Sequence, residues 1–317
     1  MSDARIIAYH PNMRAELVVH LNRAYADLRA LRPVGIEPPA QDYPDFTDDW
    51  VRAREEQGAP IALICEGDEI AAAASWHRAD HEGRCELAFI ATSPERRRQG
   101  HAAMLLARCA EWARGEGLSH VRTWRFVDSR YAPARTLLEG CGYEVADPDQ
   151  HSITMEVDIN SWHPREPELP DGYRLVRYDA SDEQDWMDLQ GAVFGNELPP
   201  GWFTKRFAGQ PNFDPNGWFF IERAGRKVGI TGAIIWFWDE AMTRPSGALI
   251  EWVGVLPDER GRNLGEALVV AALNYLKGRN VYPNCLVTQP FRKAAIGLYE
   301  KLGYQTVREM AFYVKQL

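Results

Sequence analysis

The sequence has few of the features that mark secreted, metal-binding or membrane-spanning proteins. Its five cysteines are scattered, odd in number and never spaced as CxxC, so we expect neither a disulfide framework nor a metal site. No run of about 18 apolar residues occurs, and the first residues, MSDARIIAYHPN, lack a basic segment followed by a long apolar one. We therefore expect a cytoplasmic protein with neither a signal peptide nor a membrane span.

Two common nucleotide-binding motifs are missing as well. Neither GxxxxGK[ST] nor GxGxxG occurs, which argues against ATP and NAD as ligands. The net charge of −9 argues against a general affinity for nucleic acid or anionic membranes. The remaining composition, 45% apolar and 26% charged over 317 residues, is typical of a soluble globular protein with enough chain for two domains.

What the chain does contain is an internal repeat. A glutamate in an apolar stretch and a basic, glycine-containing hexad recur 165 positions apart, as Glu86 and Glu251, Arg97 and Arg262, Gly100 and Gly265, and Ala102 and Ala267. Further along, LLEGCGYEV from Leu137 matches LYEKLGYQT from Leu298, at a spacing of 161 positions. Two ordered matches at similar spacings indicate two copies of one domain.

The two copies are joined by a stretch with the composition of a linker. Between residues 159 and 173 the sequence INSWHPREPELPDGY contains three prolines and no sustained apolar period. We expect an N-terminal domain over residues 1–160, a linker over 161–172 and a C-terminal domain over 173–317. Each of the two domains would have an ordinary size.

Each copy predicts the same order of elements. A first strand and two helical segments precede a hairpin, which is centred on Gly67-Asp68 in the first copy. A further strand, the basic hexad, a helix, a strand and a second helix follow. Strands near 151–158 and 309–315 close the two copies. A run of strands that then alternates with helices predicts an α/β fold, with a mixed sheet and helices on both faces.

The two hexads have the properties of a phosphate site. Each follows an apolar strand and opens an amphipathic helix, whose unpaired N–H groups and partial positive charge attract anions. A glycine in the hexad lets the main chain approach a bulky anion, because glycine has no Cβ. A single hexad of this kind is better explained as a solvated basic helix start. Its occurrence once per copy, between the same strand and helix, favours the phosphate site.

The hexads and the downstream runs LLEGCGY and LYEKLGY resemble those of the GCN5-related N-acetyltransferase (GNAT) family. The resemblance covers nearly the whole chain and implies two tandem GNAT domains that use acetyl-CoA as acyl donor. It also implies that the hexads bind the pyrophosphate of acetyl-CoA, and that the preceding strands pair with its pantetheine arm through their main chain. The cofactor-binding residues implied in the first copy are Ala88, Phe89, Ile90, Arg97, Arg98, Gln99, Gly100, His101 and Ala102. Those implied in the second copy are Val253, Gly254, Val255, Arg260, Gly261, Arg262, Asn263, Leu264, Gly265, Glu266 and Ala267.

The resemblance further implies a reaction, in which an acetyl group moves to the primary amine of a small molecule by direct attack. Family members often place a general-base glutamate on the strand before the hexad, and Glu251 and Glu86 each lie eleven positions before a hexad arginine. Tyr299 matches the tyrosine that protonates the departing thiolate, whereas the first copy has Leu138, which cannot donate a proton. We therefore expect catalysis in the C-terminal domain, and poor turnover or a structural role in the N-terminal one. The structural alternatives are a strand glutamate that pairs with a nearby arginine or faces solvent, and a core tyrosine whose hydroxyl is hydrogen-bonded.

Three residues depart from the family pattern. Arg292 and Tyr131 stand where family members often have an asparagine, and Arg292 is a candidate to meet a CoA phosphate or an acidic acceptor. His101 stands where a small residue is usual. We expect His101 on the surface of its helix rather than in a catalytic role.

The motifs leave the acceptor open. Tandem members of the family acetylate a mycothiol precursor, aminoglycosides, peptides or small amines, and the negative net charge would suit a cationic amine. Tryptophans of the second copy either line an acceptor cleft or fill the core: Trp202, Trp218, Trp236, Trp238 and Trp252. A non-catalytic acetyl-CoA-binding or regulatory module is the alternative function, and O-acylation or another acyl donor would fit the same fold. We expect a monomer or homodimer with no nucleic-acid partner.

Overall fold

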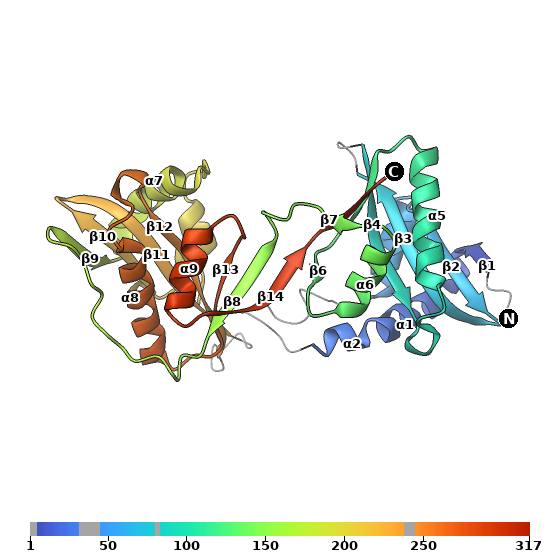
Figure 1. The fold of residues 1–317 in the computed structure, drawn as a ribbon, viewed down its shortest axis with the longest axis horizontal. Helices are drawn as coiled ribbons and strands as arrows, with labels where there is room; N and C mark the ends of the chain where they lie inside the picture. The colour runs from blue at the N-terminus through green and yellow to red at the C-terminus, as the bar shows by residue number, and fades with distance from the viewer. Residues whose placement is uncertain (1–4, 32–44, 80–82, 238–244) are drawn as a thin grey trace. The chain divides into compact units, whose positions relative to one another are not determined.

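The computed structural model describes residues 5–31, 45–79, 83–237 and 245–317 (Figure 1). Within these residues the chain forms two compact units. The N-terminal unit comprises the chain up to Ser152 together with Arg308–Leu317, and the C-terminal unit comprises Ile153–Val307. Among the described residues, no helix is both long and apolar enough to cross a membrane.

The N-terminal unit is built around a mixed sheet that has seven strands in the described residues. The strands follow the order β1-β2-β3-β4-β5-β15-β7, and neighbours are antiparallel except β4 and β5. The strands are β1 Arg5–Ala8, β2 Ile61–Glu66, β3 Glu69–Arg78, β4 Arg84–Thr92, β5 His120–Thr123, β7 Glu144–Val145 and β15 Tyr313–Gln316. The helices are α1 Arg14–Ala24, α2 Ala26–Arg29, α4 Asp48–Glu56, α5 His101–Gly115 and α6 Ala132–Gly140, and a short strand, β6, covers Val127–Asp128.

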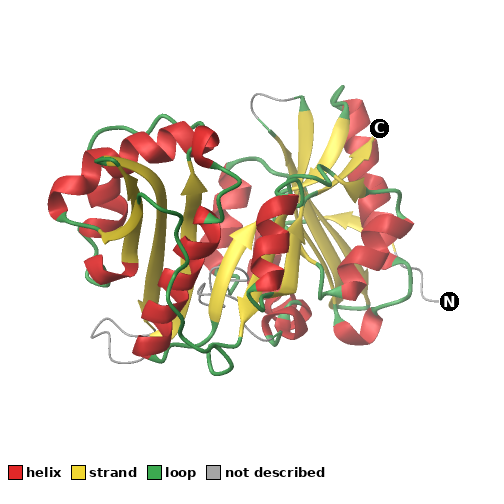
Figure 2. Ribbon diagram, turned by 60° about the vertical axis from the view of Figure 1, so that its left-hand side comes forward, coloured by secondary structure: helices red, strands yellow, loops and turns green. Residues whose placement is uncertain are grey.

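Local sequence accounts for most of these elements. The β2–β3 hairpin turns at Gly67, whose φ of 64° is a left-handed conformation that glycine adopts without a Cβ penalty. α5 covers one face of the sheet with Leu105 and Cys109, which lie one helical turn apart. α1 covers the opposite face with Leu17 and Leu21. Helices therefore lie on both faces of the sheet, as the order of elements predicts (Figure 2).

The C-terminal unit repeats this arrangement. Its sheet runs from β9 through β10, β11, β12 and β13 to β8, with β12 and β13 as the parallel pair. The strands are β8 Ser152–Val157, β9 Tyr173–Arg177, β10 Trp218–Arg223, β11 Arg226–Phe237, β12 Pro245–Val255 and β13 Asn284–Thr288, followed by β14 Gln305–Ala311. The helices are α7 Glu183–Phe194, α8 Leu264–Arg279 and α9 Lys293–Lys301, and a π-helical stretch covers Thr204–Ala208.

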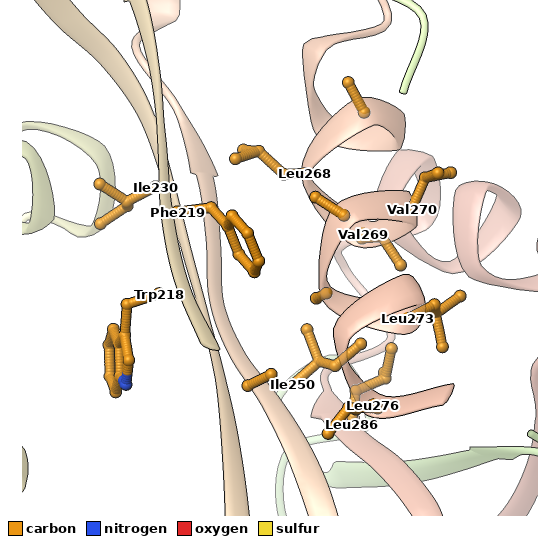
Figure 3. Close-up of a cluster of buried hydrophobic side chains, with 14 of the residues drawn as sticks. Trp218, Phe219, Ile230, Ile250, Leu268, Val269, Val270, Leu273, Leu276 and Leu286 are labelled. Atoms are coloured by element: carbon orange, nitrogen blue, oxygen red, sulfur yellow. The ribbon is translucent and has the colours of Figure 1, made fainter. Parts of the chain in front are cut away.

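The core of the C-terminal unit lies between α8 and the sheet. Figure 3 shows Leu268 and Leu276 of α8 facing Phe219 and Ile250 of the strands. Trp218, the neighbour of Phe219 in the chain, points to the opposite face, as successive residues of a strand do. Both leucines are fully buried, and each such burial contributes about 1.5–3 kcal/mol to folding.

The two units exchange their closing strands. β8, which was expected to close the first copy, pairs with β13 in the C-terminal unit, where Met155 lies opposite Leu286. β15, at the end of the chain, pairs with β5 and β7 in the N-terminal unit. The compact units therefore differ from the sequence ranges 1–160 and 173–317 in these two segments, while residues 161–172 contain no helix or strand. Local sequence predicts a strand in each segment but does not specify which sheet the strand joins.

Candidate functional sites in the two units

In each unit the parallel pair of strands parts along its length. β4 and β5 stay paired as far as Leu87 and Thr123. β12 and β13 stay paired as far as Leu249 and Cys285. Beyond these points no described strand pairs with that edge of β4 or β12. Main-chain groups of the two edges that no side chain contacts are therefore available to an extended ligand.

A β-bulge reshapes each of these strands where the pair parts. The register between β3 and β4 shifts at Ala88, and the register between β11 and β12 shifts so that Trp252 and Val253 lie opposite Thr231. Trp252 has a φ of 58°, a left-handed conformation that is costly for a residue with a side chain. Bulges and strained residues of this kind gather next to binding sites, where they redirect the main chain.

The stretch that follows each strand has the same unusual backbone. Arg98 and Gly100 have φ values of 66° and 86° just before α5 begins. Gly261 and Asn263 have φ values of 78° and 59° just before α8 begins. Left-handed residues in such a turn direct main-chain N–H groups toward one side, and with the N-terminus of the helix they form a cradle for an anion.

The backbone therefore makes Gly261 the counterpart of Arg98, and Asn263 the counterpart of Gly100, each 163 positions later. The hydrogen bonds of two arginines agree with this spacing of 163. Arg97 donates from Nε to the carbonyl oxygen of Thr92 at 3.5 Å, and Arg260 donates from Nε to that of Val255 at 3.1 Å. Arg260 is therefore the structural counterpart of Arg97.

The spacing of 165 positions inferred from sequence is therefore wrong for this segment. The second hexad starts at Arg260, two positions earlier than its sequence suggested, because Asn263 stands in for a glycine. Asparagine tolerates the left-handed conformation better than most residues with a side chain. The counterpart of Glu86 is then Leu249. Glu251 lies two residues further along β12, on the same face and nine positions before the hexad arginine.

The N-terminal unit contains a cavity of about 630 Å³ where β4 and β5 part. Leu87–Thr92 of β4 line one side, Thr123 and Arg125 line the other, and the anion cradle around Gly100 lines one end. The volume falls within the range of sites for small molecules and cofactors.

Side chains from the α1–α2 region contact residues that line this cavity. Asp27 forms an ion pair with Arg97 at 2.6 Å and accepts a hydrogen bond from the hydroxyl of Tyr131 at 3.0 Å. Tyr25 donates from its hydroxyl to the carbonyl oxygen of Ile90 at 3.1 Å. The charge of Arg97, the hexad arginine of the N-terminal unit, is thus paired with a carboxylate of the same protein chain.

Glu86 matches the structural alternative considered for it. Its carboxylate accepts hydrogen bonds from Nε and a terminal nitrogen of Arg84, at 3.1 and 2.8 Å. His77 lies 3.3 Å from its other oxygen. Leu138, in the place of the tyrosine, is 3% exposed and belongs to the core. The N-terminal unit therefore has an occupied carboxylate and no phenolic hydroxyl at these positions.

Glu251 has different surroundings. In the described part of the chain its carboxyl makes no ion pair, and burial raises its pKa above the ordinary value of 4.5. The positive charge of Arg206 and the neighbouring Trp252 oppose this rise in pKa. Arg206 lies on the π-helical stretch that follows α7. A carboxyl whose pKa is raised toward neutrality is suited to accept a proton.

Tyr299 lies on α9 and is 7% exposed. Burial raises its pKa to about 12, and the charge of Arg292 acts in the opposite direction. The guanidinium of Arg292 lies 5.6 Å from the ring centre of Phe194, and that ring lies 5.4 Å from the ring of Trp252. Arg292 and Phe194 therefore link the surroundings of Tyr299 to Trp252, which is next to Glu251 on β12.

Comparison with known proteins accounts for this repeated geometry. The sequence profile of the Acetyltransferase (GNAT) family matches residues 21–143 and again residues 183–304. The chain belongs to the GNAT family. One match falls in each copy, so the protein is a tandem GNAT acetyltransferase, and acetyl-CoA is its acyl donor.

Relatives narrow the comparison further. The mycothiol acetyltransferase of Thermobispora bispora is 32% identical over 91% of this chain and 92% of its own length. Those of Thermomonospora curvata and Streptomyces avermitilis are 29% and 26% identical, over 68% and 81% of this chain and 69% and 80% of their own lengths. The GNAT protein described here is thus an N-acetyltransferase similar to mycothiol synthase.

Solved structures share the tandem fold. A GCN5-related N-acetyltransferase from Sphaerobacter thermophilus matches with a TM-score of 0.55 and 19% identity, over 99% of this chain and 95% of its own. A tandem GNAT protein from the clavulanic acid biosynthesis pathway matches with a TM-score of 0.55 and 16% identity, over 99% and 98%. These likenesses confirm the predicted α/β fold with two GNAT domains.

Within this GNAT frame, some hexad side chains serve the fold. His101 was expected on the helix surface, but it is 4% exposed and lies 3.4 Å from Glu66. The expectation was wrong because the residue faces the sheet rather than solvent. Arg262 donates to the carbonyl oxygen of Asp258 at 2.8 Å and lies 3.3 Å from Glu259. Its charge is thus partly neutralised by its own turn.

The tryptophans divide between the core and the region around Glu251. Trp218 is 2% exposed and belongs to the core. Trp202 stacks on Trp186 at 6.0 Å, and Trp252 packs edge-on against both rings. Trp236 is partly buried against Leu249, and Trp238 lies outside the described residues.

Sequence reasoning missed two kinds of residue. It did not single out Arg206 or Phe194, because no motif marks these residues. Phe194 ends α7 and packs on Trp252 of β12, and Arg206 lies on the π-helical stretch, from which its charge acts on Glu251. Sequence reasoning also misplaced the start of the second hexad, although a signal was present. Pro94 and Pro257 each stand three positions before the arginine that donates to the strand, and they are 163 positions apart.

Proposed function

We propose that the C-terminal unit transfers the acetyl group of acetyl-CoA to a primary amine of a small molecule, with Glu251 as general base and Tyr299 as general acid. The observation that carries this proposal is the burial of Glu251 and its lack of an ion-pair partner. Its carboxyl has no ion-pair partner in the described chain, and burial raises its pKa. Both properties distinguish it from Glu86, which is held by Arg84 and His77.

The residues present fit acetyl-CoA, mainly through main-chain groups. Gly261, Asn263 and the first turn of α8 would direct N–H groups to the pyrophosphate. The edge of β12 over Val253–Val255 would pair with the pantetheine arm. Arg260 is exposed and has no carboxylate partner in the described chain, so its charge is available to a phosphate. When bound, acetyl-CoA supplies the acetyl group as a thioester.

Two protons have to move during the transfer. An amine in water is mostly an ammonium ion and must lose a proton before its lone pair can attack. Glu251 would take that proton, directly or through a water molecule. Tyr299 keeps its own proton at neutral pH, because burial raises its pKa to about 12, with Arg292 opposing. It would give this proton to the departing sulfur.

The N-terminal unit is proposed to bind acetyl-CoA without turning it over. The support is specific, because this unit combines the cavity of about 630 Å³ with an anion cradle. Glu86 is engaged by neighbouring cations, and Leu138 stands where the C-terminal unit has its tyrosine. A non-catalytic binding role is therefore the second candidate function, and we assign it to this unit alone.

The acceptor we propose is the cysteinyl-glucosaminyl-inositol precursor of mycothiol, or a small amine like it, such as an aminoglycoside. The support is identity of 32% to a mycothiol acetyltransferase over nearly the whole of both chains. The charge of −9 would favour a cationic acceptor over an anionic one.

Release of free thiol from acetyl-CoA, measured over a panel of amines, tests this proposal. We expect Glu251→Gln and Tyr299→Phe each to reduce kcat/KM by about 10²-fold or more, since general acid–base groups contribute on that scale. Glu300→Gln is the matched control, because Glu300 is exposed on α9 next to Tyr299. Unchanged thiol release in both site variants would show that the roles are assigned to the wrong residues.

A further inference from the structure

Three strands of the N-terminal unit carry a row of polar side chains on the face that α4 covers. His77 lies opposite Glu86, and Glu86 lies opposite Arg122. Paired residues share one face of a sheet, and so do residues two apart in a strand, so Trp124 continues the row. Arg54 of α4 reaches this row, since its guanidinium lies 4.3 Å from the ring centre of Trp124.

The row carries an excess of positive charge. Glu86 is already shared by Arg84 and His77. Three further arginines have no carboxylate partner in the part of the chain that is described, and we call them the arginine cluster: Arg54, Arg122 and Arg125.

Arg54 is the most unusual member of the arginine cluster. It is only 7% exposed, yet its guanidinium contacts the rings of Trp50 and Trp124 and donates no hydrogen bond to any described residue. In Arg122 the Nε is itself buried and lacks an acceptor, and the guanidinium lies 3.7 Å from the ring centre of Phe312. Buried donors that stay unpaired are costly, so buried guanidinium groups are usually found with an anion.

The arginines also repel one another. Burial lowers the pKa of Arg54, the charge of Arg125 lowers it further, and Glu86 opposes both. Burial likewise lowers the pKa of Arg122, together with the charge of Arg84 and against that of Glu86. An anion among these groups would relieve both the repulsion and the missing hydrogen bonds.

One member of the arginine cluster, Arg125, lines the cavity between β4 and β5, and Arg54 contacts the same Trp124 ring as Arg125. Arg125 lines this cavity near its inner end, where Leu87 and Thr123 are the last paired residues. The anion cradle at Gly100 lines the other end, beyond Thr92. Thr92 lies five positions after Leu87 along the strand, which is about 16 Å at ~3.3 Å per residue. One elongated cavity therefore has a phosphate-type cradle at one end and Arg125 near the other.

We propose that the arginine cluster binds a carboxylate group at the inner end of this cavity. The carboxylate belongs either to the acyl chain of a dicarboxylic acyl-CoA that occupies the cavity, or to a separate small carboxylic acid beside CoA. An acetyl group carries no charge and would leave the arginines unpaired. This inference rests on the CoA binding proposed for the N-terminal unit and refines the ligand bound there, and it does not depend on the acetyl transfer proposed for the C-terminal unit.

Calorimetric titration of the full chain with acetyl-CoA, succinyl-CoA, CoA and succinate tests the inference. If the carboxylate is on the acyl chain, one site binds succinyl-CoA about tenfold or more tighter than acetyl-CoA, as expected for a charge-assisted contact. Arg54→Gln and Arg125→Gln each remove that preference. If the carboxylate belongs to a separate molecule, succinate binds in the presence of CoA, and the same substitutions abolish its binding.

Arg52→Gln is the matched control, because Arg52 lies two residues from Arg54 on α4 but is exposed and pairs with Asp48. Without ligand, Arg54→Gln should unfold at the same or a higher temperature, since it removes an unpaired buried charge. Arg125 is exposed, so its substitution gives a folded protein in which to repeat the titration. Equal affinity for acetyl-CoA and succinyl-CoA in the wild type, with no binding of succinate, overturns the inference.

Discussion

Glu86 and Glu251 show how surroundings determine what a strand carboxylate can do. Glu86 lies between an arginine and a histidine, and its oxygens are taken by both. Glu251 has no such partner in the described chain, and burial raises its pKa. The same residue type is thus part of an ion-pair network in one copy and a candidate base in the other.

The raised pKa of Glu251 predicts a pH dependence. A general base acts only when it is ionised, so kcat/KM should fall as the pH drops through a midpoint above the ordinary 4.5. Arg206 favours the ionised form, so Arg206→Gln should shift this acidic limb to higher pH. Rate profiles of the wild type and Arg206→Gln measure the shift, with Arg226→Gln as an exposed control.

Protein stability gives an independent reading of the same group. Because burial places the folded-state pKa of Glu251 above the unfolded-state value, ionisation costs folding stability as the pH rises through that interval. Glu251→Gln stays neutral and should therefore be at least as stable as the wild type at pH 7. A Glu251→Gln protein that melts well below the wild type at pH 7, and a wild-type rate with no acidic limb, would contradict the assignment.

At the scale of elements, the cap of α8 carries the anion cradle of the C-terminal unit. Asn263 is left-handed there, with a φ of 59°, and we expect Asn263→Gly to keep both the fold and acetyl-CoA binding. Asn263→Val should cost about 1–2 kcal/mol, because a β-branched residue is strained in this conformation, and should weaken acetyl-CoA binding. Thermal unfolding and acetyl-CoA titration measure the two effects.

The other end of α8 provides the control for this prediction. Asn280 is also left-handed, with a φ of 52°, but it lies sixteen residues beyond Leu264 at the C-terminal cap. Asn280→Val should lose similar stability and keep acetyl-CoA affinity. Equal loss of affinity in the two valine variants would mean that strain in the helix, and not the cradle, controls binding.

The elements with a strong local signal were predictable, and those fixed by distant contacts were not. Gly67 marks a hairpin and the period of Leu268 and Leu276 marks a helix, because each signal acts within a few residues. The register of the second hexad was misread, since Asn263 replaces a glycine in a conformation that its sequence does not show. Arg54 carries no motif at all. Its role is visible only once α4 is placed over β5.

At the scale of the whole molecule, the exchange of closing strands ties each unit to sequence from the other copy. β15 completes the sheet of the N-terminal unit, where Tyr313 is 4% exposed and Val314 lies opposite Arg122. β8 completes the sheet of the C-terminal unit, where Met155 is fully buried. If the chain were cut between the copies, each piece would lack the strand that closes its sheet, because that strand would lie on the other piece.

Two tyrosines near the end of the chain test this exchange. Tyr313 packs in the core of the N-terminal unit, and Tyr304, nine residues earlier, packs in the core of the C-terminal unit at 2% exposure. Each alanine substitution should cost about 3–5 kcal/mol, as for other large buried aromatic side chains. Because units can unfold separately, Tyr313→Ala should speed hydrogen exchange in β4 and α5, and Tyr304→Ala in β12 and α8.

Local hydrogen exchange separates the two possible connectivities. In an unexchanged fold both tyrosines would belong to the C-terminal domain, and both substitutions would loosen β12 and α8 while leaving α5 protected. In the exchanged fold the effect of Tyr313→Ala appears more than 150 residues before it in the chain, at amides such as Leu105 of α5 and Leu87 of β4. Loss of protection at those amides without change in α8 is the expected result, because Tyr313 contributes its ring to the core that α5 and β4 share.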